Sequence, residues 1–216
     1  MTFPLWLEPI AHVTKAQSAW FPQFAPPTDG SARVSAVLML FGESDGEPDV
    51  LLTERAMGLS NHAGQVSFPG GTIDPDDDGP VGAALREGVE ETGLDPAGVD
   101  VLETLPTFWI SVTNYAVTPV LAWWRKPSPV RAVDPAEVAS VHRVPLNDLL
   151  EPTNRMQIQH PDGTTGPAFR TNGLLVWGFT AGVLSRLFEV AELERPWDRT
   201  RVTSLPAALS DLPRRA

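Results

Sequence analysis

Residues 68–94, FPGGTIDPDDDGPVGAALREGVEETGL, decide how this chain is interpreted. Two glycines open the stretch, an acidic run follows, and residues 80–92 have the pattern of an α-helix. That helix carries Glu87, Glu90 and Glu91, and spacings of three and four residues place their carboxylates on one face. Like charges at this spacing repel one another, so the cluster does not serve the stability of the helix. A divalent cation would reverse the sign of the interaction, and hard cations such as Mg²⁺ take oxygen ligands.

The residues around this helix support a metal site. Gly70 and Gly71 permit backbone conformations that turn carbonyl and N–H groups toward a ligand. Arg86 lies four residues before Glu90 and can orient its carboxylate. Gly93 is predicted to end the helix. The alternative is a solvated acidic face with one ion pair, but the joint spacing of the arginine, the three glutamates and the glycine favours the metal site.

The acidic run before the helix resembles half of another cation site. Asp74, Asp76, Asp78 and Gly79 match the first half of an EF-hand calcium loop. The twelfth position of such a loop is a bidentate glutamate, whereas this chain has Leu85 there. We therefore interpret the run as an acidic turn, in which the Asp78 carboxylate favours the positive end of the following helix.

Residues 71–94 resemble the Nudix box, whose usual pattern is G-x5-E-x7-R-E-U-x-E-E-x-G-U, with U an apolar residue. Residues 86–94, REGVEETGL, supply the second half. The chain departs from the pattern in three places. Asp78 stands where the first glutamate would be, the loop after Gly71 is one residue longer, and Gly88 replaces an apolar residue.

Segments outside the box resemble the coenzyme A pyrophosphatase branch of this family, with its signature LLT-x-T-(S/A)-x3-R-x3-G-x3-FPGG. Residues 51–53, LLT, and 64–71, GQVSFPGG, match it, while Ser60 stands at the arginine position and Arg55 at the second threonine. The longer loop is typical of the same branch. Residues 117–120, VTPV, and 176–181, VWGFTA, are also similar, so the resemblance extends over roughly residues 34–190.

The resemblance implies hydrolysis of a nucleoside diphosphate linked to another group, with Mg²⁺ or Mn²⁺ as cofactor. It implies that Glu87, Glu90, Glu91 and the Gly71 carbonyl bind the metal, and that Arg86 holds the glutamates in place. The general base is then a box glutamate, Glu87 or Glu90, or an acid from a later loop. Glu137 is our candidate for the later acid, and a solvated loop glutamate is the alternative.

Four residues near the glycine loop are expected to contact the substrate: Arg55, His62, Gln65 and Gly70. A purely structural hydrogen bond explains His62 equally well. Three tryptophans are candidates to stack on an adenine, although core packing is the favoured interpretation: Trp109, Trp123 and Trp124.

The hydrophobic patterns predict an α/β (α+β) fold with a helix on each face of a sheet. The resemblance implies a Nudix-type α/β/α sandwich with a mixed β-sheet between helices. Strands are expected at 34–41, 49–54, 101–107, 115–124 and 138–144, and helices at 80–92, 146–150 and 177–190. The expected division is an N-terminal arm, 1–31, with a short helix near 10–20; a Nudix domain, 32–190; and a C-terminal extension, 191–216.

Composition narrows the classes of partner. The 216 residues include 16 Lys plus Arg and 27 Asp plus Glu, a formal charge of −11, which argues against binding to nucleic acid or anionic membranes. There is no cysteine, which excludes disulfides and thiolate metal sites. No run approaches about 18 apolar residues, and the first nine residues lack a basic signal-like region. We expect a soluble cytoplasmic protein with a small-molecule nucleotide as partner, and we leave a homodimer open.

The leading functional hypothesis is a pyrophosphohydrolase that cuts coenzyme A or acyl-CoA to 3′,5′-ADP and a 4′-phosphopantetheine. The enzymatic alternative is another Nudix substrate: ADP-ribose, a dinucleotide or a damaged nucleoside triphosphate. A non-catalytic nucleotide-sensing module is the alternative of another class. The three glutamates argue against it, because a pure binder has no need of mutually repulsive carboxylates.

Overall fold

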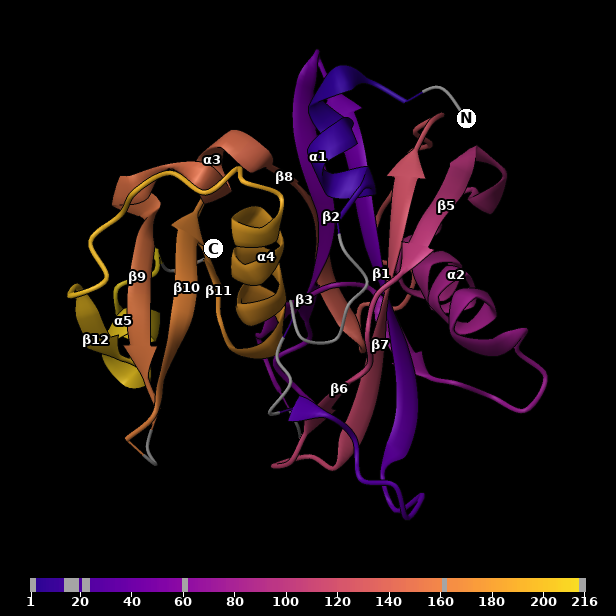
Figure 1. Cartoon of the computed structure of the whole chain (residues 1–216), viewed down its shortest axis with the longest axis horizontal. Coiled ribbons are helices and arrows are strands. Elements are labelled where there is room, and N and C mark those ends of the chain that lie inside the picture. Colours follow the sequence, from indigo (N-terminus) through magenta and orange to yellow (C-terminus); the bar gives the residue numbers. More distant parts are fainter. Residues whose placement is uncertain (1–2, 14–19, 21–23, 60–61, 161–162, 214–216) are drawn as a thin grey trace.

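The computed structural model describes residues 3–13, 20, 24–59, 62–160 and 163–213. Two β-sheets lie on either side of the helix α4 (Gly178–Val190), and a second long helix, α2 (Gly79–Thr92), lies on the far face of the larger sheet (Figure 1). The larger sheet therefore lies between two helices.

The larger sheet contains eight strands: β1 (Arg33–Ser44), β2 (Glu47–Arg55), β3 (Val66–Ser67), β4 (Gly70–Thr72), β5 (Val99–Thr104), β6 (Phe108–Ile110), β7 (Tyr115–Trp124) and β8 (Val138–Pro145). The main order is β3-β2-β1-β7-β5, and β4, β6 and β8 pair with β1, β7 and β2. The pair β1–β7 is parallel and the other pairs are antiparallel. This mixed sheet between helices confirms the expected fold class.

Alternation along the central strands gives each face of the sheet its own core. Leu38 and Leu40 of β1 pack with Ala83 and Ala84 of α2. Side chains on the other face, including Met39, pack against α4 and the N-terminal arm. Helix α2 ends at Gly93, whose φ of 70° is left-handed and whose N–H bonds to the Val89 carbonyl. The expected stop is thus confirmed.

A second sheet was not expected from the sequence. Its strands are β9 (Arg155–Gln159), β10 (Thr165–Thr171), β11 (Leu174–Val176) and β12 (Val202–Ser204), in the order β11-β10-β9-β12. The strand β12 belongs to the expected C-terminal extension and pairs parallel with β9. Helix α5 (Leu205–Ser210) follows, and its Ala208 is buried against this sheet. The division at 1–31, 32–190 and 191–216 stays a prediction, but the last segment does not lie apart from the second sheet.

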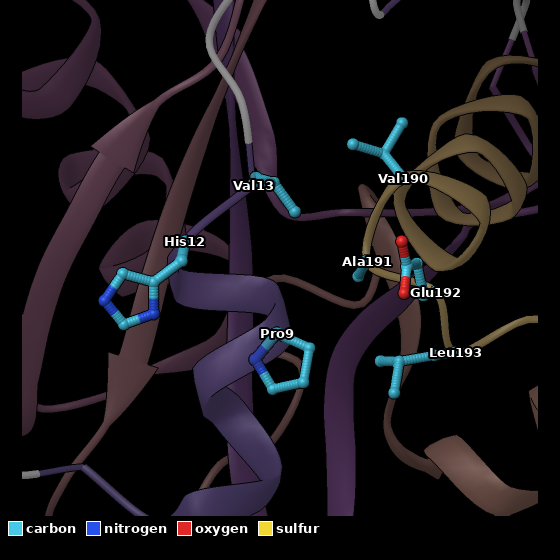
Figure 2. A pocket seen from close by; sticks show the side chains of 7 residues that line it. All are labelled: Pro9, His12, Val13, Val190, Ala191, Glu192 and Leu193. Carbon is cyan, nitrogen blue, oxygen red and sulfur yellow. The ribbon is translucent and has the colours of Figure 1, made fainter.

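The N-terminal arm packs on the α4 side of the larger sheet. A 3₁₀ turn, η1 (Leu5–Leu7), leads into the short helix α1 (Glu8–Ala11), and Leu7 and Ile10 are fully buried. The expected helix near 10–20 therefore begins earlier, while 14–19 lie outside the described residues. Figure 2 shows the pocket where Pro9, His12 and Val13 meet residues 190–193 at the end of α4, with the His12 ring pointing away from them.

Short elements complete the chain: η4 (Pro96–Gly98), α3 (Leu146–Leu150) and η5 (Pro152–Asn154). Among the described residues, no helix has the length and apolar character needed to cross a membrane.

Candidate active site

The glycine pair brings a strand and a helix unusually close together. Gly70 and Gly71 lie in β4, opposite Val37 and Ala36 of β1. A Cβ on Gly70 would overlap the backbone of β1, and one on Gly71 would overlap the Glu87 carboxylate. Neither glycine has a positive φ. Glycine is therefore needed at both positions because it has no side chain. The conformational freedom inferred from the sequence is not used.

Arg86 is the central connector of the site. Its Nε and Nη2 donate to the two carboxylate oxygens of Asp77, each at 3.0 Å. Its Nη1 donates to Glu87 Oε1 at 3.0 Å and to Glu90 Oε2 at 3.2 Å, and Nη2 also reaches the Thr72 carbonyl at 3.0 Å. The hydrogen bond to Asp77 raises the pKa of Arg86 and lowers that of Asp77. Arg86 thus joins the acidic turn, β4 and the helix.

The acid that engages Arg86 is Asp77 and not Asp78. Asp78 occupies the N-cap of α2, but its side chain makes no capping hydrogen bond. The Asp77 carboxylate instead also accepts the backbone N–H of Asp74 at 2.8 Å. This corrects the role expected for Asp78. The signal was present in the sequence, because the box spacing counted forward from Gly71 lands on Asp77.

Glu91 is the most buried acid of the cluster. Only 6% of the residue is exposed, and its Oε2 is buried without a hydrogen-bond partner. Burial raises the pKa of Glu91 to about 8, with further contributions from the charges of Glu87 and Glu137. A buried carboxylate oxygen without a partner indicates a missing ion or water. Glu91 therefore has the surroundings expected of a cation ligand.

Glu87 lies between Glu91 and the arginine. Burial raises the pKa of Glu87, and its hydrogen bond with Arg86 acts in the opposite direction. Glu90 lies further out, with 58% of its side chain exposed, and is held by Arg86. The structure thus brings all three box glutamates and Gly71 together, with Glu87 and Glu91 innermost.

Glu137 reaches the same site from the loop before β8. Its charge raises the pKa of both Glu87 and Glu91, so it lies close enough to act on them. Its carbonyl accepts the N–H of Ala56 at 2.8 Å, which ties the loop to the end of β2. Because the Glu137 side chain is exposed, it lies at the solvent side of the cluster.

The expected substrate contacts divide into two groups. Arg55, at the end of β2, lowers the pKa of Glu91 through its charge, and its Nε is buried without a hydrogen-bond partner. His62 Nδ1 and Gln65 Oε1 instead lie 2.7 Å apart and bond to each other. Arg55 and Gly70 therefore border the carboxylates, while His62 and Gln65 form a local contact. Ser60 lies outside the described residues.

The donor set fits a hard divalent cation. Glu87, Glu90, Glu91 and the Gly71 carbonyl offer only oxygen, as Mg²⁺ and Mn²⁺ require. Within the described ranges, no three acidic or imidazole side chains already form a complete cage. Mg²⁺ usually keeps several waters and needs only one or two carboxylates from the protein, so the partnerless oxygen of Glu91 and the adjacent Glu87 satisfy that requirement.

The tryptophans occupy different surroundings. Trp123 and Trp124 are buried in the cores on the two faces of the sheet. Trp109, in β6, donates from Nε1 to Asn114 Oδ1 at 3.1 Å and lines a cavity beside α4. Only Trp109 of the three is therefore placed to meet a ligand.

Comparison with known proteins identifies the family. The NUDIX domain model matches residues 32–162. Nudix hydrolase 15, mitochondrial, of Arabidopsis thaliana is 36% identical over 176 residues, which cover 76% of this chain and 60% of that protein. An uncharacterized Nudix hydrolase, NudL, of Cronobacter sakazakii is 40% identical over 148 residues, covering 65% of this chain and 74% of that protein.

A solved structure supports the fold. The Nudix hydrolase RenU of M. smegmatis superimposes with a TM-score of 0.50 at 22% identity, covering 78% of this chain and 95% of that one. Together with the clustered box residues on α2 and β4, these matches show that the chain belongs to the NUDIX domain family of hydrolases.

Proposed function

We propose that the chain is a pyrophosphohydrolase that uses Mg²⁺ or Mn²⁺ to cut nucleoside diphosphate derivatives. Coenzyme A or acyl-CoA is the leading substrate, giving 3′,5′-ADP and a 4′-phosphopantetheine. The observation that carries this proposal is the buried, partnerless oxygen of Glu91 beside Glu87 and the Gly71 strand. A nucleotide binder without turnover gains nothing from burying an acid that repels its neighbours.

Glu87, Glu91 and the Gly71 carbonyl would hold the metal, with Glu90 next to them. The bound ion would neutralise the diphosphate and lower the pKa of the attacking water. Arg86 fixes the Glu87 and Glu90 carboxylates from one guanidinium group, which Asp77 anchors from behind. Because Arg86 holds both carboxylates in fixed positions, they need little reorganisation during the reaction.

Two residues outside the helix would act on the substrate. Glu137 is exposed and lies close enough to act on Glu87 and Glu91, so its carboxylate can accept the proton of the attacking water. Arg55 carries a positive charge next to Glu91, and its guanidinium can donate to the phosphoryl oxygens. Such donors stabilise the negative charge that develops during phosphoryl transfer.

The preference for coenzyme A rests on where the signature segments lie. Residues 51–53 belong to β2, which ends at Arg55, and the FPGG segment leads into β4. Each segment therefore leads to a residue beside the carboxylate cluster, Arg55 near Glu91 and Gly71 against Glu87. The same proposal includes a cytoplasmic location and a small-molecule nucleotide as partner, and it leaves a homodimer open.

A substrate panel tests the proposal. Coenzyme A, ADP-ribose, NADH and nucleoside triphosphates are incubated with Mg²⁺ or Mn²⁺, and the products are identified by mass spectrometry. We expect Glu87→Gln and Glu91→Gln to lower kcat about 100-fold or more while the circular dichroism spectrum is kept. The matched control is Glu47→Gln, an exposed glutamate in the β2 hairpin.

Each outcome of the panel has a definite meaning. Cleavage of coenzyme A to 3′,5′-ADP supports the full proposal, and cleavage of ADP-ribose alone changes the substrate but keeps the chemistry. Unchanged rates in both glutamate variants would refute the metal site. Saturable nucleotide binding with no hydrolysis of any diphosphate would favour the sensing module.

A further inference from the structure

A cavity of about 650 Å³ lies beside α4, between the two sheets. Its walls come from β6 and the loop after it, from α4, from the β9–β10 hairpin, and from Trp197 and Arg199 near the C-terminal end. We call it the intersheet cavity. Ligand pockets usually measure about 300–1,000 Å³, so its size suits an organic group rather than an ion.

The sequence of α4 keeps this cavity open. Gly178, Gly182 and Ser185 line it on one side of the helix. A Cβ on Gly182 would meet no atom within 4 Å, so no neighbour requires a glycine there. A glycine inside a helix costs about 1 kcal/mol relative to alanine. This position is therefore open toward the cavity, and a side chain larger than alanine there would fill part of it.

The cavity lining is mostly apolar, with hydrogen-bonding groups on the β9–β10 hairpin. The charged residues of the lining already form ion pairs. Phe108, Phe179 and Val183 contribute apolar surface. Arg186 pairs with Glu189 at 2.7 Å. Arg199 pairs with Glu194 at 3.0 Å.

A phosphate would have to compete with these carboxylates for the guanidinium groups. A neutral ligand would leave both ion pairs in place. Gln157, His160 and Thr165 offer hydrogen bonds to amide or hydroxyl groups of such a ligand.

The cavity approaches the carboxylate cluster at Gly178 and Gln65. Gly178 lines the cavity, and Gln65 Nε2 lies 3.1 Å from the position that a Cβ on Gly178 would take. The Gln65 carbonyl in turn accepts the N–H of Arg55 at 3.0 Å. Gln65 therefore stands between the cavity and the arginine that faces Glu91.

The register of the larger sheet gives the distance to be spanned. Phe108 of β6 pairs with Val117, Val117 with Ser35, and Ser35 with Thr72 of β4. The cavity wall and the end of the glycine strand thus lie on one line across the sheet, three strand spacings apart. Each spacing is about 4.8 Å, so the separation is about 14 Å. An extended substrate arm of that length is long enough to reach from the end of β4 to the cavity wall.

We propose that the intersheet cavity binds the neutral arm that the substrate carries beyond its diphosphate, an elongated, mainly apolar chain with amide groups of the pantetheine type. This inference rests on the proposed function. It adds the part of the molecule at which the substrate is selected. The second sheet and the segment carrying Trp197 then serve specificity, while the box on α2 serves the chemistry.

A binding experiment tests the cavity without catalysis. Pantetheine, which has no phosphate, is titrated in EDTA and followed by tryptophan fluorescence, since Trp109 and Trp197 line the cavity. Gly182→Phe fills the space, Gly182→Leu fills part of it, and Gly182→Ala is the matched control because it gains the same helix propensity with little volume. We expect saturable binding in the wild type and in Gly182→Ala, and at least tenfold weaker binding in Gly182→Phe.

Kinetics with two substrates complete the test. In Mg²⁺, Gly182→Phe should raise KM for coenzyme A at least tenfold, while kcat/KM for ADP-ribose, which lacks the arm, stays within twofold. An equal loss for both substrates would mean that the cavity holds the nucleoside, and would overturn the inference. Pantetheine binding that is absent in the wild type, or unaffected in folded Gly182→Phe and Gly182→Leu, would overturn it as well.

The two proposals fail in different ways. If the wild type cleaves coenzyme A but the Gly182 series leaves its KM unchanged, the intersheet cavity is overturned and the proposed function stands. If no diphosphate is cleaved but pantetheine binds and Gly182→Phe abolishes that binding, the cavity is supported and the proposed function fails.

Discussion

At the scale of single residues, the Asp77–Arg86 contact sets the positions of the box glutamates. Asp77 binds Arg86 through both carboxylate oxygens, and the same guanidinium reaches Glu87 and Glu90. Asp78 is exposed and makes no capping bond. Two adjacent aspartates therefore differ sharply in their surroundings.

This difference predicts unequal effects of substitution. Asp77→Ala should lower kcat about 10- to 100-fold, the usual cost of removing a group that orients a metal ligand. Asp78→Ala, the matched control, should stay within about threefold of the wild type, because it leaves Arg86 and its partners in place. Steady-state kinetics with the best panel substrate measure both, and a larger loss in Asp78→Ala would contradict the placement of Arg86.

The pKa of Glu91 predicts how stability depends on pH. Its folded value of about 8 lies above the ordinary value of 4.5, so the folded state holds a proton that the unfolded state releases. This group therefore lowers the free energy of unfolding as pH rises from about 4.5 to 8. Glu91→Gln lacks this decrease, so without metal its stability relative to the wild type should rise between pH 5 and pH 8.5, by up to about 5 kcal/mol for the shift from 4.5 to about 8 at about 1.4 kcal/mol per pKa unit.

Urea unfolding in EDTA at pH 5 and pH 8.5 measures this effect. Glu47→Gln, at an exposed position, should follow the wild type at both values. Parallel behaviour of Glu91→Gln and the wild type would show that Glu91 is not held protonated. Adding Mg²⁺ should stabilise the wild type more than Glu91→Gln, because only the wild type keeps the ligand.

The site residues could be predicted from sequence where spacing alone decides them. The helical period places Glu87, Glu90 and Glu91 on one face. Arg86 lies one turn before Glu90. Asp77 was missed because the loop after Gly71 is one residue longer than usual, so counts from its two ends give different aspartates. Spacing within a loop does not fix side-chain direction, whereas spacing within a helix does.

At the scale of elements, α2 is placed by a close contact with the sheet at Gly88. A Cβ on Gly88 would lie 2.9 Å from Leu38 Cδ2 and 3.0 Å from Leu94 Cδ2. An apolar side chain of the usual box type has no room there. The departure of Gly88 from the box pattern is therefore explained by the tight packing of the helix against β1 and its own C-terminal turn.

Two glycines of this helix give a matched pair for stability. Gly82→Ala adds a Cβ at ordinary contact distances of 3.4 Å or more and should stabilise the protein by about 0.5–1 kcal/mol through helix propensity. Gly88→Ala should gain less, and Gly88→Val should lose about 1–3 kcal/mol through overpacking. Urea unfolding compares them; a stabilising Gly88→Val would show that α2 can move away from the sheet.

The long elements were predictable, and the short helix expected at 146–150 is confirmed as α3, but the short strands of the second sheet were not predicted. The strands β1, β2, β7 and β8 and the helices α2 and α4 carry clear periodic patterns over many residues. The strands β9 to β12 have seven residues or fewer, and β10 includes Gly166 and Pro167, which interrupt its pattern. Their pairing depends on contacts between segments distant in sequence, such as β9 with β12. Hydrophobic patterns within a short segment do not predict such contacts.

At the scale of the whole molecule, one buried arginine fastens the C-terminal segment to the second sheet. Only 1% of the Arg155 side chain is exposed, and it pairs with Glu194 at 2.9 Å. Arg155 also contacts the face of Trp197, while Trp197 donates to Glu194. This cluster connects β9 to the chain that continues toward β12.

Removing the charge partner should destabilise the whole protein. Glu194→Gln leaves Arg155 buried without an opposite charge, which typically costs about 3–5 kcal/mol. The matched control is Asp211→Asn, whose partner Arg170 lies 3.6 Å away at the surface, and which should cost at most about 1 kcal/mol. Thermal and urea unfolding measure both; similar small losses would mean that Arg155 finds other compensation.

The parallel pair β1–β7 has a consequence for hydrogen exchange. Its register runs without interruption from Arg33–Tyr115 to Phe41–Trp123, and its centre, from Leu38–Val120 to Leu40–Ala122, is fully buried. Amide protons at this buried centre should exchange only when the whole domain opens, so they are expected to report its global unfolding energy. Of the strands that wall the cavity, β9 and β10 belong to the separate ladder of the second sheet, and we expect that ladder to open independently of β1–β7. Protein dynamics would then be concentrated where the substrate arm enters, while the centre that carries the catalytic helix stays closed.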